Sequence, residues 1–229
     1  MIDPAGREGA KCHFREACCT SLEAVQAAWR TGARRIELCE RLELGGVTPA
    51  EDLLQDVLAW TRLAPVPEDG GAPLPVHVLV RPRGGDFVYD ETEVEAMLES
   101  ISLCRALGAQ GVVIGALTPD GAVDLPVMRR LIAAAEGLSV TFHRAFDETA
   151  DPLVALEDVI ALGCHRLLTS GHAPDAFAGR ALIGSLVRRA AGRIVIMAGC
   201  GVRPGNIAAI ARDSGATEFH SSCISDYWP

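Results

Sequence analysis

The sequence predicts a TIM (β/α)8 barrel that forms one domain over residues 1–229. Short apolar segments alternate with amphipathic helical stretches along the whole chain, which is the order typical of a parallel α/β fold. Each stretch between two strands is long enough to return the chain for a parallel strand. A chain of 229 residues can also bury one large core without dividing. A doubly wound open sheet is the alternative, because strands and helices alternate there as well.

The predicted strands cover residues 14–19, 34–39, 76–81, 111–115, 138–143, 164–169, 193–198 and 216–221. The helices between them are expected at about 21–30, 49–63, 91–107, 124–136, 152–162, 175–190 and 204–212. Only residues 223–229 follow Ser222, so we expect the last helix of the barrel to be short or missing.

Residues that can cap a helix precede most of these stretches. A capping side chain accepts a hydrogen bond from a free backbone N–H of the first turn, and proline is tolerated at the first helical position. The predicted caps are Thr20 or Ser21, Thr48 with Pro49, Asp90, Asp124 with Pro126, and Asp151 with Pro152. The Pro- and Gly-rich segment 64–75 follows a helix and precedes a strand, so we expect a surface connection away from the active end of the barrel.

Composition excludes several classes of protein. The net charge of -9 argues against nucleic acid and against an acidic membrane surface as partners. The sequence has no apolar run long enough to span a membrane, and residues 1–11 lack the apolar core of a signal peptide. The eight cysteines are scattered and form no C-x-x-C pair, which argues against a structural zinc site. We therefore expect a cytoplasmic protein with reduced thiols.

Charged and polar residues occupy the inward positions of several predicted strands. Because side chains alternate along a strand, the first two strands both direct an E-x-C element inward. The inward set is Glu16, Cys18, Glu37, Cys39, His77, Arg81, Thr141, His143, Thr169, Glu218 and His220. Barrel interiors usually hold branched apolar residues, and a buried charge is costly unless it is paired. We therefore expect ion pairs such as Glu37 with Arg81; Glu16 could equally hold an arginine, and His77 could be structural.

The ends of these strands supply candidate catalytic and anion-binding residues. Barrel enzymes keep their chemistry at the C-terminal ends of the strands, which selects His143, Glu37 and His220 as candidate acid/base residues. Arg81 and Arg83 carry forked donors suited to carboxylate or phosphate.

Glycines after the seventh strand add a candidate phosphate site. Gly199 and Gly201 precede a short helix, and Ser221 lies at the end of the eighth strand. Loops in these positions commonly bind phosphate in this fold. The alternative is a tight strand exit that only glycine can make.

Six segments together resemble the copper homeostasis protein CutC family. They are RIELCERLELGGVTP (35–49), VRPRGGDFVY (80–89), TFHRAFD (141–147), LTSG (168–171), IMAGCGV (196–202) and EFHSS (218–222). The resemblance covers nearly the whole chain and implies a TIM barrel, a cytosolic location, a copper-linked function and self-association as a homo-oligomer. The family pattern has glycine where this chain has Cys200.

Two functions remain open from the sequence. Cu(I) favours thiolate ligands, so Cys18 and Cys39 on neighbouring strands could form a copper site, helped by His143 or His220. The same end of the barrel could instead belong to an enzyme that acts on a small phosphorylated or carboxylated molecule by acid/base chemistry.

Overall fold

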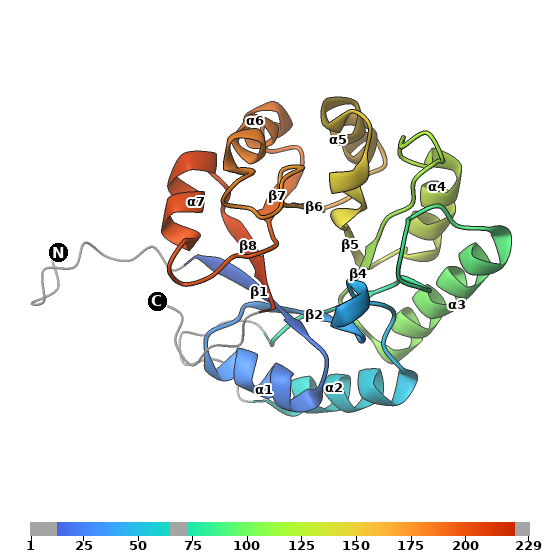
Figure 1. Cartoon of the computed structure of the whole chain (residues 1–229). Coiled ribbons are helices and arrows are strands. Elements are labelled where there is room, and N and C mark those ends of the chain that lie inside the picture. The colour runs from blue at the N-terminus through green and yellow to red at the C-terminus, as the bar shows by residue number, and fades with distance from the viewer. Residues whose placement is uncertain (1–12, 65–72, 223–229) are drawn as a thin grey trace, which may run out of the picture.

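The computed structural model describes residues 13–64 and 73–222 as a closed barrel of eight parallel strands (Figure 1). Every strand pairs with its sequence neighbours, and β1 pairs with β8 to close the barrel. The prediction of a TIM barrel is therefore confirmed, and the open sheet is excluded. The strands are β1 Phe14–Cys19, β2 Arg35–Leu38, β3 Val76–Leu79, β4 Gly111–Ile114, β5 Ser139–Phe142, β6 Arg166–Thr169, β7 Val195–Ala198 and β8 Glu218–Ser221.

Helices surround the barrel from α1 round to α7 (Figure 1). They are α1 Leu22–Arg30, α2 Glu51–Leu63, α3 Glu91–Leu107, α4 Leu125–Ala134, α5 Pro152–Ala161, α6 Arg180–Ala190 and α7 Ile207–Ser214. The 3-10 helices η1 (Leu42–Leu44) and η2 (Arg144–Glu148) follow β2 and β5. Within the described residues no helix follows β8, and no helix is long and apolar enough to cross a membrane.

Four of the five predicted helix caps are present. Ser21, Asp90, Asp124 and Asp151 each accept a hydrogen bond from a backbone N–H of the first turn. Asp90 also forms a reciprocal capping box with Glu93, which satisfies two free backbone donors at once.

The predicted start of α2 at Thr48 and Pro49 is wrong, because the helix begins at Glu51. The Thr48 hydroxyl instead exchanges hydrogen bonds with the backbone of Arg81, at 2.9 Å to its nitrogen and 3.1 Å to its oxygen. These bonds tie the end of β3 to the loop after β2. Helices α6 and α7 also begin later than predicted, after short turns.

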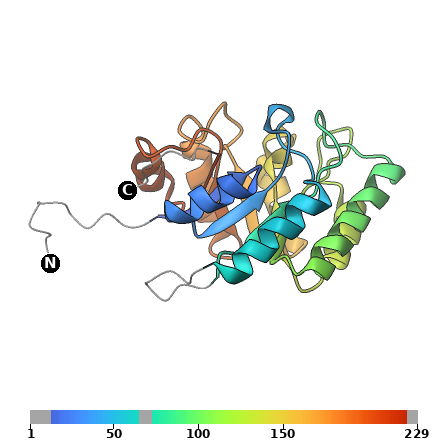
Figure 2. The same ribbon diagram turned by 90° about the horizontal axis from the view of Figure 1, so that it is seen from below.

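The alternation predicted for the strands separates two apolar regions. Ile36, Leu38 and Cys19 face outward and pack in the large layer between strands and helices. Cys18, Cys39, Leu79 and Val113 form a small separate cluster inside the barrel. In the side view of Figure 2 the loop that carries η1 rises at one edge of the barrel. This edge carries the C-terminal ends of the strands, where the candidate site lies.

Candidate functional site

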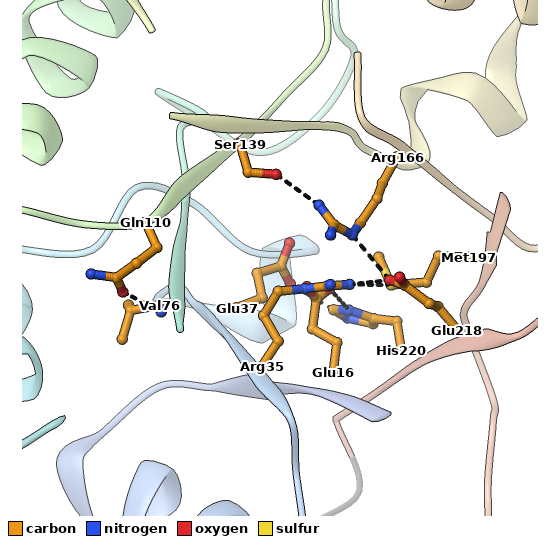
Figure 3. Close-up of polar contacts among 10 residues, drawn as sticks. All are labelled: Glu16, Arg35, Glu37, Val76, Gln110, Ser139, Arg166, Met197, Glu218 and His220. Atoms are coloured by element: carbon orange, nitrogen blue, oxygen red, sulfur yellow. Dashed lines mark hydrogen bonds and ion pairs between the residues drawn. The ribbon is translucent and has the colours of Figure 1, made fainter. Parts of the chain in front are cut away.

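A network of buried charges crosses the interior near the N-terminal ends of the strands (Figure 3). The guanidinium of Arg35 donates to the carboxylates of Glu16 and Glu218. Arg166 reaches the same Glu218 with Nε at 3.0 Å and donates from Nη1 to the Ser139 hydroxyl at 2.7 Å. Glu16 thus does hold an arginine, and the charges are buried in pairs as their desolvation cost requires.

His220 lies between two carboxylates above this network. Its Nδ1 is 2.8 Å from Oε1 of Glu16, and its Nε2 is 3.4 Å from Oε2 of Glu37. Burial by itself would lower the pKa of His220, but the charges of Glu37 and Glu16 and the hydrogen bond to Glu16 raise it overall. Burial likewise opposes ionisation of Glu16, yet His220 and Arg35 hold the pKa of that carboxyl well below its usual range. Glu16 and His220 therefore form a buried ion pair.

The predicted pairing of Glu37 with Arg81 is wrong, because Glu37 contacts His220 instead. Glu37 aligns with His77 in the register of β2 and β3. Arg81 lies four residues beyond His77, which places it about 13 Å further along the strand direction. The register of the barrel, which spacing along one strand does not reveal, decides the partner.

Cys18 and Cys39 meet directly inside the barrel. Their Sγ atoms are 3.4 Å apart, and both side chains are buried. The hydrogen bond to Cys39 and burial raise the pKa of the Cys18 thiol well above its usual value. Donor atoms of Cys18, Glu37 and His220 also lie within 4.8 Å of one another. Two soft sulfur donors with a carboxylate and an imidazole nearby fit the ligand preference of Cu(I).

A cavity of about 590 Å³, which we call the upper cavity, opens above these cysteines at the C-terminal ends of the strands. Cys18, Cys39, Glu37, Arg81, His143 and His220 all line it. The structure thus brings together the predicted metal ligands, all three predicted acid/base residues and one predicted anion ligand. A cavity of this volume falls within the range found for small-molecule sites.

Arg81 is held by the loops around the upper cavity. Its Nη1 donates to the carbonyls of Leu44 and Gly46, each at 3.0 Å, and its Nη2 donates to Gly85 at 2.6 Å. The guanidinium also stacks on the Phe87 ring, with its central carbon 4.6 Å from the ring centroid. Most of its donors are therefore already used to fix the loops after β2 and β3.

His143 is a buried neutral imidazole at the end of β5. Its Nδ1 accepts the backbone N–H of Ala145 at 3.1 Å, so the ring carries its proton on Nε2. Burial and the nearby charge of Arg81 lower the pKa of His143 to about 3. Nε2 is buried and has no hydrogen-bond partner among the described residues.

The other predicted anion ligands lie outside the lining of the upper cavity. Arg83 pairs with Glu93 at 2.5 Å and with Asp86 at 2.9 Å. The Ser221 hydroxyl donates to the carbonyl of Val202 at 2.9 Å. Gly199 and Gly201 are the remaining predicted anion ligands. A Cβ atom added to Gly199 would collide with Leu168, and a Cβ atom added to Gly201 would collide with Asp175. Close packing thus accounts for both glycines.

Asp147 organises the loop edge of the cavity and was not predicted as a site residue. Its carboxylate accepts the backbone N–H groups of Ser170 and His172 and the hydroxyl of Thr169. Asp147 and His172 both line the upper cavity. Strand alternation could not identify them, because Asp147 lies in η2 and His172 in the loop after β6, both outside the strands. Only the TFHRAFD segment pointed to Asp147.

Comparisons with known proteins show the family of the chain and agree with its fold. The family model described as the CutC family matches residues 13–225. A CutC family protein of Parabacteroides distasonis is 49% identical over 210 residues, covering 92% of this chain and 82% of its own. One from Chromobacterium violaceum is 48% identical over 207 residues, covering 90% and 79%.

Solved structures give the same result. The crystal structure of CutC from Streptococcus agalactiae, provisionally named a copper homeostasis protein, is similar with a TM-score of 0.85 and 30% identity. The match covers 93% of this chain and 100% of that chain. A deoxyribose phosphate aldolase from Aeropyrum pernix is also similar, with a TM-score of 0.66 and 14% identity. The match covers 92% of this chain and 86% of that chain. At this low identity the similarity shows a shared barrel fold and nothing more. On the family model and the relatives together, the chain belongs to the CutC family.

Proposed function

We propose that this protein takes part in copper homeostasis by binding Cu(I) through Cys18 and Cys39 inside the barrel. The observation that carries the proposal is the 3.4 Å contact between the two Sγ atoms at the inner end of the upper cavity. Cu(I) is a soft ion that prefers thiolate ligands, and both cysteines line the upper cavity. The copper homeostasis name of the Streptococcus agalactiae relative supports the assignment.

Glu37 and His220 would act beside the metal rather than as its main ligands. A thiol must lose its proton before it can bind a metal, so binding releases protons. Burial raises the pKa of Glu37, which makes this carboxyl a better proton acceptor, and Glu37 lies next to Cys18. His220 contacts Glu37 from below and is itself held by Glu16.

The proposal is tested by loading the reduced protein with Cu(I) and measuring copper content and X-ray absorption at the copper edge. We expect one copper per chain with a first shell of two sulfur atoms. A first shell of nitrogen and oxygen alone, or no retained copper, would contradict the proposal. The Cys104→Ser, Cys164→Ser variant serves as the matched control, because both cysteines are buried but lie outside the upper cavity.

A second candidate function is an enzyme that acts on a small phosphorylated or carboxylated molecule. The size of the upper cavity favours it, because about 590 Å³ is far more than a metal ion needs. His220 and Glu37 would exchange protons with the substrate, and the buried Nε2 of His143 would donate to one of its oxygens once the site rearranges.

Anion binding tests this second candidate. Phosphate, sulfate or a sugar phosphate should raise the melting temperature, and Arg81→Ala should abolish the effect. A ligand at 100 times its Kd stabilises a protein by about 2.7 kcal/mol, which a melting scan detects. Unchanged melting with all these anions, in a protein that binds Cu(I) tightly, would leave copper binding as the function.

We further propose that the protein works in the cytoplasm as a homo-oligomer. The resemblance to the family supports both expectations. Light scattering of the purified protein during size-exclusion chromatography measures the oligomer directly, and a monomer at all concentrations would refute self-association.

A further inference from the structure

Three side chains of different chemistry converge at the inner end of the upper cavity. Cys18, Glu37 and His220 come from the neighbouring strands β1, β2 and β8, and all three line the cavity. One ligand atom from each lies within 4.8 Å of the other two, and the described residues hold no second group of this kind. A sulfur, a carboxylate oxygen and an imidazole nitrogen are together the ligand types of a zinc site.

The register of the barrel brings these atoms together. Cys18 on β1 aligns with Glu37 on β2. On the other side of β1, His220 aligns with Glu16, which lies two residues before Cys18 and so shares its inward face. Because the three ligands come from segments far apart in the sequence, the lack of a C-x-x-C pair argues only against a zinc site built on a short loop.

The distance between the nitrogen and the oxygen matches a metal with four ligands. Nε2 of His220 is 3.4 Å from Oε2 of Glu37, which is longer than the usual hydrogen bond between nitrogen and oxygen. Zinc bonds of about 2.0–2.1 Å at the tetrahedral angle place two such ligands about 3.3–3.4 Å apart. The two atoms are therefore already at the separation that a zinc ion between them requires.

His220 is oriented in the way that a metal ligand needs. Its Nδ1 is 2.8 Å from Oε1 of Glu16, and the same carboxylate accepts a hydrogen bond from Arg35 (Figure 3). A histidine that ligates a metal almost always holds its other ring nitrogen against a carboxylate, a carbonyl or water, which fixes the ring and makes the ligating nitrogen more basic. Nε2 is the ring nitrogen that remains, and it faces Glu37.

The charges of the three ligands balance those of a divalent ion. A thiolate at Cys18 and the carboxylate of Glu37 carry two negative charges, and a neutral His220 adds none. The side chains of Glu37 and His220 are only 6% and 11% exposed, so a net charge at this place would be costly. A doubly charged ion forms a neutral group with these ligands, whereas a singly charged ion would leave a net negative charge inside the barrel.

We propose that Cys18, Glu37 and His220 form a binding site for Zn²⁺, with the fourth ligand position open to the upper cavity. Three protein ligands with one open position are the arrangement of catalytic zinc sites, in which water or a substrate takes the fourth place. The proposal goes beyond copper binding and does not rest on it. The two sites share Cys18, but Cys39 lies outside the zinc group and belongs to the Cu(I) pair.

Zinc binding is measured on the reduced, metal-free protein by competition with a chromophoric zinc chelator. We expect one Zn²⁺ per chain. X-ray absorption at the zinc edge should show one sulfur at about 2.3 Å and nitrogen and oxygen neighbours at about 2.0–2.2 Å. A first shell with two or more sulfur atoms, or no retained zinc, would overturn the proposal.

Glu37→Gln removes the anionic ligand and keeps the shape of the side chain. Loss of a group beside a metal ligand alone costs about 10–100-fold in affinity, so loss of a ligand should weaken zinc binding at least about 100-fold. The matched control Glu148→Gln removes the same charge from the wall of the same cavity but lies outside the zinc group, and it should leave the zinc affinity unchanged. Equal zinc affinities of the two variants would refute the site. If Glu37→Gln does not fold, the absorption spectrum of the unchanged protein still decides the ligand set.

A second variant separates this proposal from copper binding. Cys39→Ser should lose Cu(I) binding and keep zinc binding, whereas Glu37→Gln should weaken zinc binding far more than Cu(I) binding. Unchanged Cu(I) affinity in Cys39→Ser would refute the copper proposal alone. Zinc affinity that falls as far in Cys39→Ser as in Glu37→Gln would refute the zinc site of three ligands and leave the copper proposal standing.

Discussion

Replacing Glu16 by glutamine tests the buried charge network most sharply. Glu16 is fully buried and bonds both Arg35 and His220. Removing one partner of a buried ion pair costs about 3–5 kcal/mol, because the other charge is left without compensation. Arg35 keeps its second carboxylate, Glu218, at 2.6 Å, so we expect the lower end of that range, about 3 kcal/mol.

The assay is urea unfolding of the wild type and Glu16→Gln at pH 7. The matched control is Glu157→Gln, since Glu157 pairs with Arg189 and Arg193 at the surface, where a salt bridge contributes about 0–1 kcal/mol. A loss below about 1 kcal/mol for Glu16→Gln, equal to the control, would refute the reasoning about buried charge.

The pH dependence gives an independent check on Glu16. Its pKa in the folded protein lies below the unfolded value of about 4.3. The stability that it contributes is therefore present above that value and is lost as the pH falls toward the folded pKa. The gap in stability between wild type and Glu16→Gln should narrow below about pH 4. A gap that stays constant down to pH 3 would contradict the assigned ion pair.

Three further predictions concern packing, capping and titration. Gly111→Ala would place a Cβ atom 2.6 Å from the His77 ring, so we expect the free energy of unfolding in urea to fall by about 1–3 kcal/mol. The control Gly205→Ala would meet no atom within 4 Å and should change that free energy by less than about 0.5 kcal/mol. Asp90→Ala removes the capping box of α3 and should cost about 1 kcal/mol by the same measurement; no loss would show that the cap is dispensable. The pKa of His143 is about 3, so its ring resonances in NMR spectra should not shift between pH 5 and 8, and a midpoint near 6.5 would contradict the buried neutral ring.

Much of the site followed from strand alternation alone. The period of two placed Cys18 and Cys39 inside the barrel and Cys19 outside it, as the structure confirms. The same rule directed His143 and His220 to the end that forms the upper cavity. Alternation suffices here because a shift of one residue would move every charged side chain into the apolar layer beneath the helices.

Partners across the barrel could not be predicted in the same way. Whether Glu37 meets Arg81 or His220 depends on the stagger between strands, which is a property of the closed barrel. The loop role of Arg81 escaped prediction for a related reason. Its acceptors are backbone carbonyls of Leu44, Gly46 and Gly85, and the position of a carbonyl carries no signature in the sequence.

The affinity for Cu(I), measured by competition with a Cu(I) chelator under reducing conditions, tests the central claim most directly. Loss of groups beside a metal ligand alone costs about 10–100-fold in affinity, so removing both thiols should cost at least about 100-fold. We predict that loss for the Cys18→Ser, Cys39→Ser variant and wild-type affinity for the Cys104→Ser, Cys164→Ser control. Equal affinity of the two variants would show that copper does not bind at the paired cysteines inside the barrel.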